Sequence, residues 1–437
     1  MPNPGDTVKV VTKKETIEGV LMPSFDEQVV LLKLDTGYNI GLEKKDITKI
    51  MVVKPAAKII PKKEILEVNP QLPTIAILHT GGTIASKVDY RTGGVTAAFS
   101  PSQLLDLFPE LKMIENIESE LIAQMWSDDL RFAHFPVIAK AIEKYIKKGA
   151  AGIIIGMGTD NLAVASAALA FIVEKTPVPI ILVGSQRSSD RGSADAGMNL
   201  ICAAQFITKS DFAGVAICMH AHEDDDVCSI LPATKTYKLH SSRRDAFKAV
   251  NSDAIASVGY KERVVHMIAK EYERKGKEKL VLKSAMEDKV GLLKIHVNMF
   301  PEQFELFQGY KGLVIEGTGL GHTPGQVPNP ECAIHKKIYP AIKKVIDSGC
   351  VVVMTTQCLF GAVNMNVYDK GRDLLDLGVI SGKDMLGNTA LVKLSWLLGN
   401  YKREEVLKLI GENLRGEINE RIGYEKDFFS LNLFFHA

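Results

Sequence analysis

The sequence lacks the features that mark several classes of protein. None of its six cysteines is part of a CxxC pair, so a reducing compartment fits best. The first residues contain no apolar core of a signal peptide, and the longest apolar run, residues 162–173, is too short to cross a bilayer. We therefore expect a soluble, cytoplasmic protein without a membrane contact.

An excess of charge of one sign is also missing. Lysine and arginine number 53 against 52 aspartates and glutamates, which leaves a formal net charge of +1. No field of the whole chain therefore attracts nucleic acid or an acidic membrane, and any contact with nucleic acid has to be local.

The first 53 residues differ in texture from the rest. Short β-rich runs at residues 7–11, 17–22, 28–34, 39–42 and 47–53 are separated by polar turns, which predicts a small five-stranded β-barrel. A docking module and a merely stabilising appendage are both open interpretations. Residues 54–73 hold four prolines and several lysines and are expected to form a semi-rigid linker.

From residue 74 onward, apolar strands alternate with helical runs. The predicted strands lack polar alternation, as is expected when both faces of a parallel sheet are covered. They lie at residues 75–79, 152–157, 179–184 and 214–220, with helices at 131–148, 161–175 and 194–208. We predict an α/β domain over residues 74–288.

A second α/β section follows over residues 289–437. Its predicted strands are residues 290–297, 312–317 and 350–355, and its helices are 331–348, 388–398 and 403–414. Between the two sections, the charged stretch 260–279 is predicted to be helical. Ligands of such folds bind at the carboxyl ends of the strands.

Thr83 follows the first of these strands across a glycine turn. Gly81 and Gly82 remove side-chain bulk and permit unusual dihedral angles, so backbone N–H groups can point at a carbonyl oxygen beside the Thr83 hydroxyl. This is a suitable place for a nucleophile.

Thr159 and Asp160 follow a second apolar strand, and Lys235 is a third candidate. A threonine hydroxyl needs a base or an electrostatic environment to act as a nucleophile. A lysine packed against Asp160 can handle a proton through Thr159, which suits attack on a carboxamide by way of an acyl-threonine. The alternatives are that Thr159 and Asp160 cap a helix and that Lys235 is a solvated surface residue.

The segments 80–86 and 158–160, together with Lys235, resemble the bacterial-type L-asparaginase family over about residues 74–420. The resemblance implies that Thr83 attacks, that Thr159 and Lys235 activate it, and that Asp160 also holds the substrate α-amino group. It places Tyr90 as the catalytic loop tyrosine and Ser127 at the substrate α-carboxylate. Asp128 and Gly82 complete the expected substrate-binding residues.

One branch is more similar. The β-rich amino-terminal region and the runs 183–191, 238–247 and 357–368 resemble the GatD family of archaeal glutamyl-tRNA(Gln) amidotransferases across essentially the whole chain. The resemblance implies an asparaginase-like two-domain fold with parallel sheets after a small SH3-like barrel, and a glutaminase that releases ammonia. It implies no cofactor in this chain, a separate partner subunit, GatE, that uses ATP and Mg²⁺ to amidate Glu-tRNA(Gln), and a homodimer within a heterotetramer.

The chain departs from the asparaginase pattern at three positions. Met157 and Asn161 replace a histidine and a threonine beside Thr159-Asp160, and Ala362 stands where an arginine is common. These changes bear on substrate fit and on contacts between subunits.

Other polar groups, His79 among them, are given no catalytic role. The run His220-Ala-His222 followed by four acidic residues offers metal-type ligands, but a solvated turn is favoured and no metal is predicted. Lys238, Arg243 and Arg244 form a local basic cluster that is interpreted as solvated charge, with a tRNA or partner contact as the alternative. Two further interpretations of the whole chain stay open: a stand-alone L-asparaginase and a non-catalytic scaffold.

Overall fold

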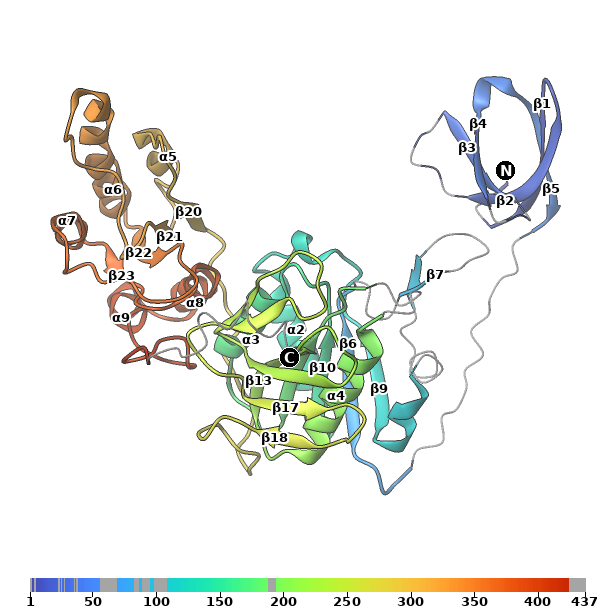
Figure 1. Cartoon of the computed structure of the whole chain (residues 1–437), viewed down its shortest axis with the longest axis horizontal. Coiled ribbons are helices and arrows are strands. Elements are labelled where there is room, and N and C mark those ends of the chain that lie inside the picture. The colour runs from blue at the N-terminus through green and yellow to red at the C-terminus, as the bar shows by residue number, and fades with distance from the viewer. Residues whose placement is uncertain are drawn as a thin grey trace, which may run out of the picture.

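The computed structural model of the chain describes residues 2–3, 5–22, 24, 26, 28–34, 36, 38–55, 69–81, 86–88, 95–97, 108–187 and 194–423. Figure 1 shows a small β domain, a central α/β domain and a carboxyl-terminal α/β domain along the chain. Within the described residues, no helix combines the length and the apolar character that a bilayer crossing requires.

The amino-terminal domain is an antiparallel sheet with the strand order β4-β3-β2-β1-β5. Its described core includes Val8 and Val10 of β1 and Val30 and Leu32 of β3. On each strand these residues are two positions apart, so they face the same side of the sheet. In the described part of the domain β4 and β5 end the strand order and do not pair, so the pairing shows a small β domain and not a closed barrel. Its elements are β1 (Thr7–Thr12), β2 (Thr16–Met22), β3 (Val29–Lys33), β4 (Asn39–Glu43), η1 (Lys44–Asp46) and β5 (Ile47–Lys54).

The central domain is built on an eight-stranded sheet with the order β18-β17-β14-β13-β12-β10-β6-β9. Five neighbouring strands of this sheet, β9, β6, β10, β12 and β13, are parallel, while β14, β17 and β18 are antiparallel. The predicted all-parallel sheet is therefore corrected to a mixed one. The strands are β6 (Thr74–His79), β9 (Asn116–Leu121), β10 (Gly152–Gly156), β12 (Pro179–Val183), β13 (Gly214–His220), β14 (Val227–Pro232), β17 (Ala256–Gly259) and β18 (Val265–Met267).

Helices cover both faces of this sheet, which explains why its parallel strands are continuously apolar. Ile153 and Ile155 point into the core beneath α2 (His134–Lys147) and α3 (Leu162–Ile172). Ile154 points to the opposite core, which α4 (Ala196–Lys209) covers. Short 3-10 turns η3 (Pro109–Met113) and η4 (Ser127–Asp129) precede α2.

The carboxyl-terminal domain has a four-stranded parallel sheet, β20-β21-β22-β23. The predicted helix 331–348 is divided into the 3-10 helix η5 (Pro330–Lys337) and α6 (Ile338–Asp347). The ring of Pro340 is incompatible with an α-helical carbonyl four residues earlier, whereas its missing N–H is tolerated in the first turn of α6. The two α/β domains share a core in which Trp396 stacks on Phe171 at 5.7 Å between ring centroids. The elements are β20 (Val290–Lys294), α5 (Pro301–Glu305), β21 (Gly312–Gly317), η5 (Pro330–Lys337), α6 (Ile338–Asp347), β22 (Val351–Thr356), α7 (Asp369–Leu377), β23 (Ile380–Ser381), α8 (Gly387–Asn400) and α9 (Arg403–Leu409).

The prediction of a helix over residues 260–279 is wrong. Val265 and Met267 alternate with His266 in β18, which pairs with β17, and this period of two outweighs the charge pattern of the surrounding residues. Three two-stranded sheets complete the described fold: β7 (Ser86–Val88) with β8 (Val95–Ala97), β11 (Val173–Lys175) with β19 (Val281–Leu282), and β15 (Thr236–Lys238) with β16 (Phe247–Ala249).

Candidate active site

The turns after β6, β10 and β12 meet at one edge of the central sheet. Gly156 of β10 lies between His79 of β6 and Val183 of β12 in the parallel register. Two backbone hydrogen bonds continue the pairing into the turns, from Thr80 N–H to the Gly156 carbonyl and from Met157 N–H to the Val183 carbonyl. Polar side chains on these turns are thereby brought together.

The turn after β6 requires its first glycine. Gly81 has a φ of +104°, in the left-handed region that favours glycine. A Cβ atom there would lie 2.5 Å from the carbonyl oxygen of Met125. Gly82, Thr83 and Tyr90 lie outside the described residues, so the nucleophile and the loop tyrosine stay predictions.

The histidine at the end of β6 lies in the core. His79 is fully buried, and burial lowers its pKa to about 4 because the imidazolium is poorly solvated there. We therefore expect the side chain to be neutral at pH 7.

The turn after β10 carries Thr159 and Asp160 with their side chains directed to Lys238. The Lys238 ammonium donates to Thr159 Oγ1 at 2.9 Å and to Asp160 Oδ1 at 2.8 Å. The side chain of Lys238 is 14% exposed. The residue that precedes α3 is Asn161, and no side-chain hydrogen bond caps that helix, so the helix-cap interpretation of Thr159 and Asp160 has no support in these bonds.

The expected contact between Lys235 and Asp160 is corrected by the structure. The Lys235 ammonium bonds Asp384 at 2.5 Å, and their side chains are only 3% and 1% exposed. Lys235 precedes β15 and points into the boundary between the two α/β domains, whereas Lys238 ends β15 and faces Thr159. The surface-lysine interpretation of Lys235 is wrong as well, since a buried carboxylate pairs with it.

Ser127 lies beside the Thr159 turn. Asn161 donates from Nδ2 to the Ser127 carbonyl at 2.8 Å and from its backbone N–H to Ser127 Oγ at 3.4 Å. A Cβ atom at Gly158 would lie 2.9 Å from Ser127 Oγ, so glycine is needed for this approach. Asp128 follows on the same 3-10 turn and is exposed.

Sequence reasoning misses three neighbours of the site: Lys238, Gln186 and Asn161. Gln186 accepts from the Thr159 hydroxyl at 3.3 Å. The local charge pattern places Lys238 among the surface charges, although it lies on the same short segment as Lys235. Asn161 stands out in the sequence only as a departure from the family pattern. Its position directly after Thr159-Asp160 is the available signal.

The arginines near Lys238 are neutralised by carboxylates. Arg243 makes two hydrogen bonds to Asp245, at 2.7 and 2.9 Å, and Arg244 bonds Asp225 at 2.5 Å. Arg243 is 40% exposed, but Arg244 and Lys238 are only 12% and 14% exposed, so the interpretation of the whole cluster as solvated surface charge is wrong.

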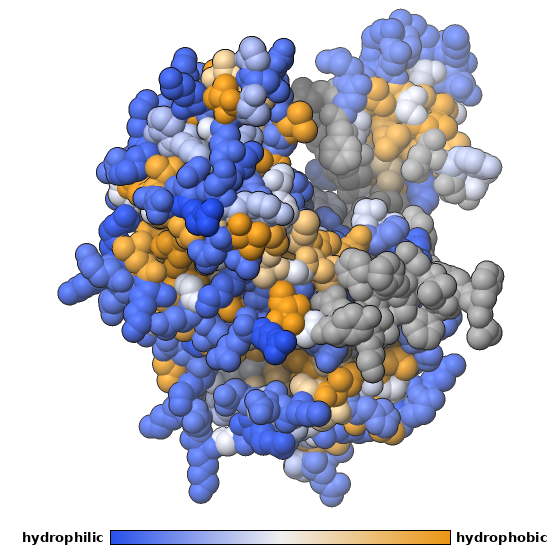
Figure 2. Space-filling model, turned by 60° about the vertical axis from the view of Figure 1, so that its left-hand side comes forward, coloured by the Kyte–Doolittle hydropathy of each residue, from blue (hydrophilic) through white to orange (hydrophobic). Residues whose placement is uncertain are grey.

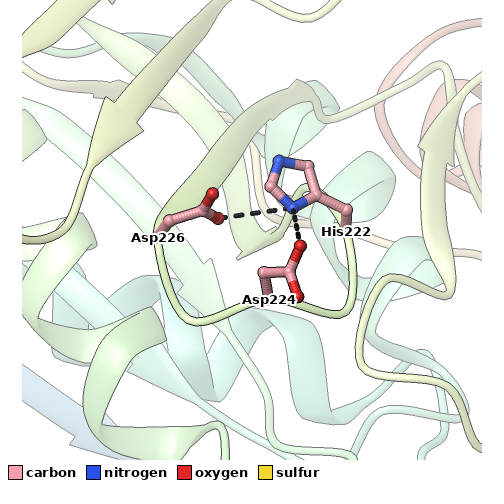
Figure 3. Close-up of side chains that lie close together, drawn as sticks. All are labelled: His222, Asp224 and Asp226. Atoms are coloured by element: carbon pink, nitrogen blue, oxygen red, sulfur yellow. Dashed lines mark ion pairs between the residues drawn. The ribbon is translucent and has the colours of Figure 1, made fainter. Parts of the chain in front are cut away.

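The metal-type ligands form a separate group on the turn between β13 and β14. Figure 3 shows the carboxylates of Asp224 and Asp226 directed at the imidazole of His222. Their ligand atoms lie within 4.8 Å of one another, but the three side chains are 48%, 87% and 48% exposed. Exposed groups of this kind are as a rule solvated, and none of them belongs to the Thr159–Lys238 site.

Comparisons with known proteins cover nearly the whole chain. Family models match residues 74–271 (asparaginase, N-terminal), 289–410 (glutaminase/asparaginase C-terminal domain) and 2–53 (GatD N-terminal domain). The glutamyl-tRNA(Gln) amidotransferase GatD of Methanococcus maripaludis is 42% identical over 96% of this chain and 99% of its own length. The GatD of Pyrococcus abyssi is 39% identical over 95% of each chain. The chain belongs to the GatD family of glutamyl-tRNA(Gln) amidotransferases.

Solved asparaginases share the fold of this GatD family member. The thermostable L-asparaginase from Thermococcus kodakarensis superimposes with a TM-score of 0.70 at 29% identity, covering 80% of this chain and 100% of its own. L-asparaginase I from Vibrio cholerae gives a TM-score of 0.67 at 25% identity, covering 80% of this chain and 99% of its own. The asparaginase-like α/β fold is thereby confirmed.

Proposed function

We propose that the chain is the glutaminase component of a glutamyl-tRNA(Gln) amidotransferase, which hydrolyses glutamine to supply ammonia for the conversion of Glu-tRNA(Gln) to Gln-tRNA(Gln). The observation that carries the proposal is the Lys238–Thr159–Asp160 group at the carboxyl edge of the central sheet. It lies at the same sheet edge as Thr80 and Gly81, which follow β6, and the family membership of the chain supports the same activity.

In this proposal Thr83 Oγ attacks the side-chain carboxamide carbon of glutamine. The C–N bond breaks, the hydroxyl proton leaves with the nitrogen as ammonia, and an acyl-threonine ester remains. Water then hydrolyses the ester to glutamate and restores the hydroxyl. Lys238, in place of Lys235, stabilises the negative charge that develops along the Thr83–Thr159 pair.

Substrate recognition is proposed for residues around the same turn. Asp160 is a ligand for the substrate α-ammonium group, and its present partner, the Lys238 ammonium, shows that the carboxylate accepts a cation. Ser127 is proposed to bind the α-carboxylate, with Asp128, Gly82 and Tyr90 as further contacts. Ser127 is 5% exposed and is held by Asn161, which keeps its hydroxyl at the edge of the turn.

The amino-terminal domain favours the amidotransferase over a stand-alone L-asparaginase. The asparaginase structures cover 80% of this chain, while the GatD relatives cover 95–96%. We propose that β1–β5 curl into an SH3-like barrel that docks onto the amidotransferase partner GatE. That partner, with ATP and Mg²⁺, would act on Glu-tRNA(Gln) in the cytoplasm.

A homodimer within the heterotetramer is part of this proposal. Figure 2 shows hydrophobic areas that interrupt a largely hydrophilic face. Large apolar side chains that stay exposed include Val297, Leu306 and Trp126, at 93%, 75% and 69%. We propose that the hydrophobic areas of this face take part in the subunit contact, because contiguous apolar surface is used in protein contacts.

Ammonia release from glutamine and from asparagine tests the proposal. We would measure the full chain alone, with GatE, and with GatE and Glu-tRNA(Gln). Thr83→Val keeps the side-chain shape and removes the hydroxyl, so it should abolish release. Undiminished release by this variant would support a non-catalytic role for the threonine, and a preference for asparagine that the partner does not change would support a stand-alone asparaginase.

A further inference from the structure

Among the described residues, Lys238 and Gln186 are the hydrogen-bond partners of the Thr159 hydroxyl. Lys238 Nζ lies 2.9 Å from Thr159 Oγ1, and Gln186 Oε1 lies 3.3 Å from the same oxygen. An ammonium group only donates, so Thr159 accepts from Lys238. The proton of the hydroxyl is then directed to the only acceptor of this pair, the amide oxygen of Gln186.

The backbone that carries Gln186 is clamped by a buried carboxylate. Asp195 is fully buried. It accepts from the Gln186 N–H at 3.0 Å, the Arg187 N–H at 2.8 Å and the Ser185 hydroxyl at 2.9 Å. Asn199 adds a fourth bond at 3.3 Å. Hydrogen bonds to a charged acceptor are stronger than neutral ones, so this turn is fixed tightly after β12.

Close packing holds the same turn against Thr159. A Cβ atom at Gly184 would lie 2.7 Å from Thr159 Cγ2 and 2.9 Å from Leu162 Cδ1. The turn therefore touches Thr159 directly, because glycine leaves no side chain between them. The amide nitrogen of Gln186 is buried and has no hydrogen-bond partner among the described residues. Within the part of the chain that the structure describes, the Gln186 side chain thus makes its polar contact through the oxygen, to Thr159.

We propose that Gln186 is a positioning residue of the amidohydrolase reaction, fixed by Asp195, that orients the Thr159 hydroxyl between Lys238 and Gln186. The proposal rests on the proposed function. By accepting the Thr159 proton, Gln186 keeps a lone pair of Thr159 Oγ1 toward Lys238. Loss of the acceptor frees the hydroxyl to rotate, so the rate of the chemical step falls while binding of glutamine is little changed.

A double-mutant cycle on the full chain with its partner GatE tests this role. Gln186→Met keeps the size of the side chain and removes the acceptor. We expect kcat for glutamine to fall about tenfold, the effect of losing one oriented hydrogen bond, with KM changed less than about twofold. Combined with Thr159→Val, Gln186→Met should have no further effect, because its target hydroxyl is already gone.

Gln205→Met is the matched control. Gln205 is a fully buried glutamine of α4 whose side-chain polar atoms have no hydrogen-bond partner among the described residues, and it lies outside the site. We expect wild-type kcat from this variant. Its Tm also shows what a Gln→Met change in the core does to stability alone.

A second readout is the pH profile of Gln186→Glu. The added carboxylate would replace an amide oxygen that lies 3.3 Å from Thr159 Oγ1, the atom that Lys238 also bonds. Lys238 already faces the Asp160 carboxylate, and a second opposite charge nearby raises the pKa of a lysine. In the pH profile of kcat/KM, the change in rate that accompanies deprotonation of Lys238 should therefore occur at higher pH than in the wild type. If the activity of Thr159→Val is too low to measure, the double-mutant cycle cannot be completed, and the pH profile then tests the positioning role.

The outcomes separate this inference from the function on which it rests. A wild-type complex that hydrolyses no glutamine, or a Thr159→Val variant as active as the wild type, overturns the proposed site. If those two results are as expected, wild-type kcat in Gln186→Met overturns the positioning role. The same fold loss with and without the Thr159 hydroxyl, or an unmoved pH profile in Gln186→Glu, overturns it too.

Discussion

Single residues at the site are distinguished by burial and partner, and Lys235 and Lys238 are the clearest case. They are three positions apart, yet Lys235 is buried on Asp384 and Lys238 reaches Thr159 and Asp160. A lysine in a buried ion pair stabilises the fold, whereas one beside a reacting hydroxyl is placed to influence the rate. Residue type alone could not separate the two roles.

Lys238→Met should lower kcat for glutamine by a factor of about 10²–10⁴, the usual contribution of a positioned acid–base group, and should leave the Tm close to that of the wild type. Lys235→Met should mainly lower the Tm. Steady-state kinetics and calorimetry on both variants make the comparison. A larger loss of kcat in a well-folded Lys235→Met than in Lys238→Met would return the catalytic role to Lys235.

Glu115 is a buried carboxyl group outside the site. It is 2% exposed, and neither carboxyl oxygen has a hydrogen-bond partner among the residues that the structure describes. Burial raises its pKa well above the usual value, because the charged form is poorly solvated. The folded state therefore keeps a proton that the unfolded chain releases above pH 4.5.

Stability should consequently fall as the pH rises from about 4.5 toward the folded-state pKa of Glu115. Glu115→Gln removes this titration, so its Tm should exceed that of the wild type by about 2–4 °C at pH 8 and approach it near pH 4. Calorimetry at both pH values checks the prediction. A Tm difference that is independent of pH would show that Glu115 does not titrate differently on folding.

Among the structural elements, those with a clear period were predictable. The five strands of the amino-terminal domain and β6, β10, β12 and β13 lie within a residue or two of their predicted ranges, because local side-chain alternation or continuous apolar character marks them. The stretch 260–279 was not predictable from its charges, since the pairing of β18 with β17 depends on a strand outside the window.

The candidate site was predictable only in its local parts. Turns of the type Gly-Thr-Asp after an apolar strand carry their own signal, so Thr159 and Asp160 could be chosen, and Ser127 came from the family resemblance. Lys238 and Gln186 reach Thr159 from 79 and 27 residues away. No local pattern encodes such contacts, since they depend on the order in which the strands join the sheet.

The turn after β10 provides a test of how an element shapes the site. Gly158→Ala would place a methyl group 2.9 Å from Ser127 Oγ, and such overpacking costs about 1–3 kcal/mol. If Ser127 binds the substrate α-carboxylate, KM for glutamine should rise about tenfold, more than kcat falls.

Gly411→Ala is the control for this variant, because a Cβ atom there has no neighbour within 4 Å. It should keep wild-type kinetics. An unchanged KM in Gly158→Ala would mean that Ser127 has room to move without loss of binding, and would count against its proposed role.

At the level of the whole chain, a polar network joins the two α/β domains through Asp384. Besides the Lys235 ammonium, this carboxylate accepts from the Asn419 backbone N–H and from Asn419 Nδ2, both at 2.9 Å. Asn419 Nδ2 also donates to the Asn251 carbonyl at 2.7 Å. Residues from the central domain, the carboxyl-terminal domain and the end of the described chain therefore depend on one carboxylate.

Lys235→Met leaves Asp384 buried without its counter-ion, which is expected to cost about 3–5 kcal/mol. Lys235→Met combined with Asp384→Asn removes the charge while retaining an acceptor for Asn419, so it should recover a large part of that loss. Urea unfolding of the single and double variants measures both values. Additive losses in the double variant would show that the pair contributes no coupling between the domains.

The amino-terminal domain should be separable from the catalytic unit. The buried apolar cluster that its described residues form is its own, and L-asparaginase structures that match this chain do so over 99–100% of their length while covering 80% of it. A variant without residues 2–53 should therefore fold with a Tm within about 2–4 °C of the full chain and keep glutamine hydrolysis.

We propose that this domain docks the partner. In the presence of GatE, the variant without residues 2–53 should therefore transfer much less ammonia to Glu-tRNA(Gln) than the full chain does. Sedimentation with GatE and the two activities, measured side by side, check this. Undiminished transfer would make the domain a stabilising appendage, and loss of hydrolysis together with folding would make it part of the catalytic unit.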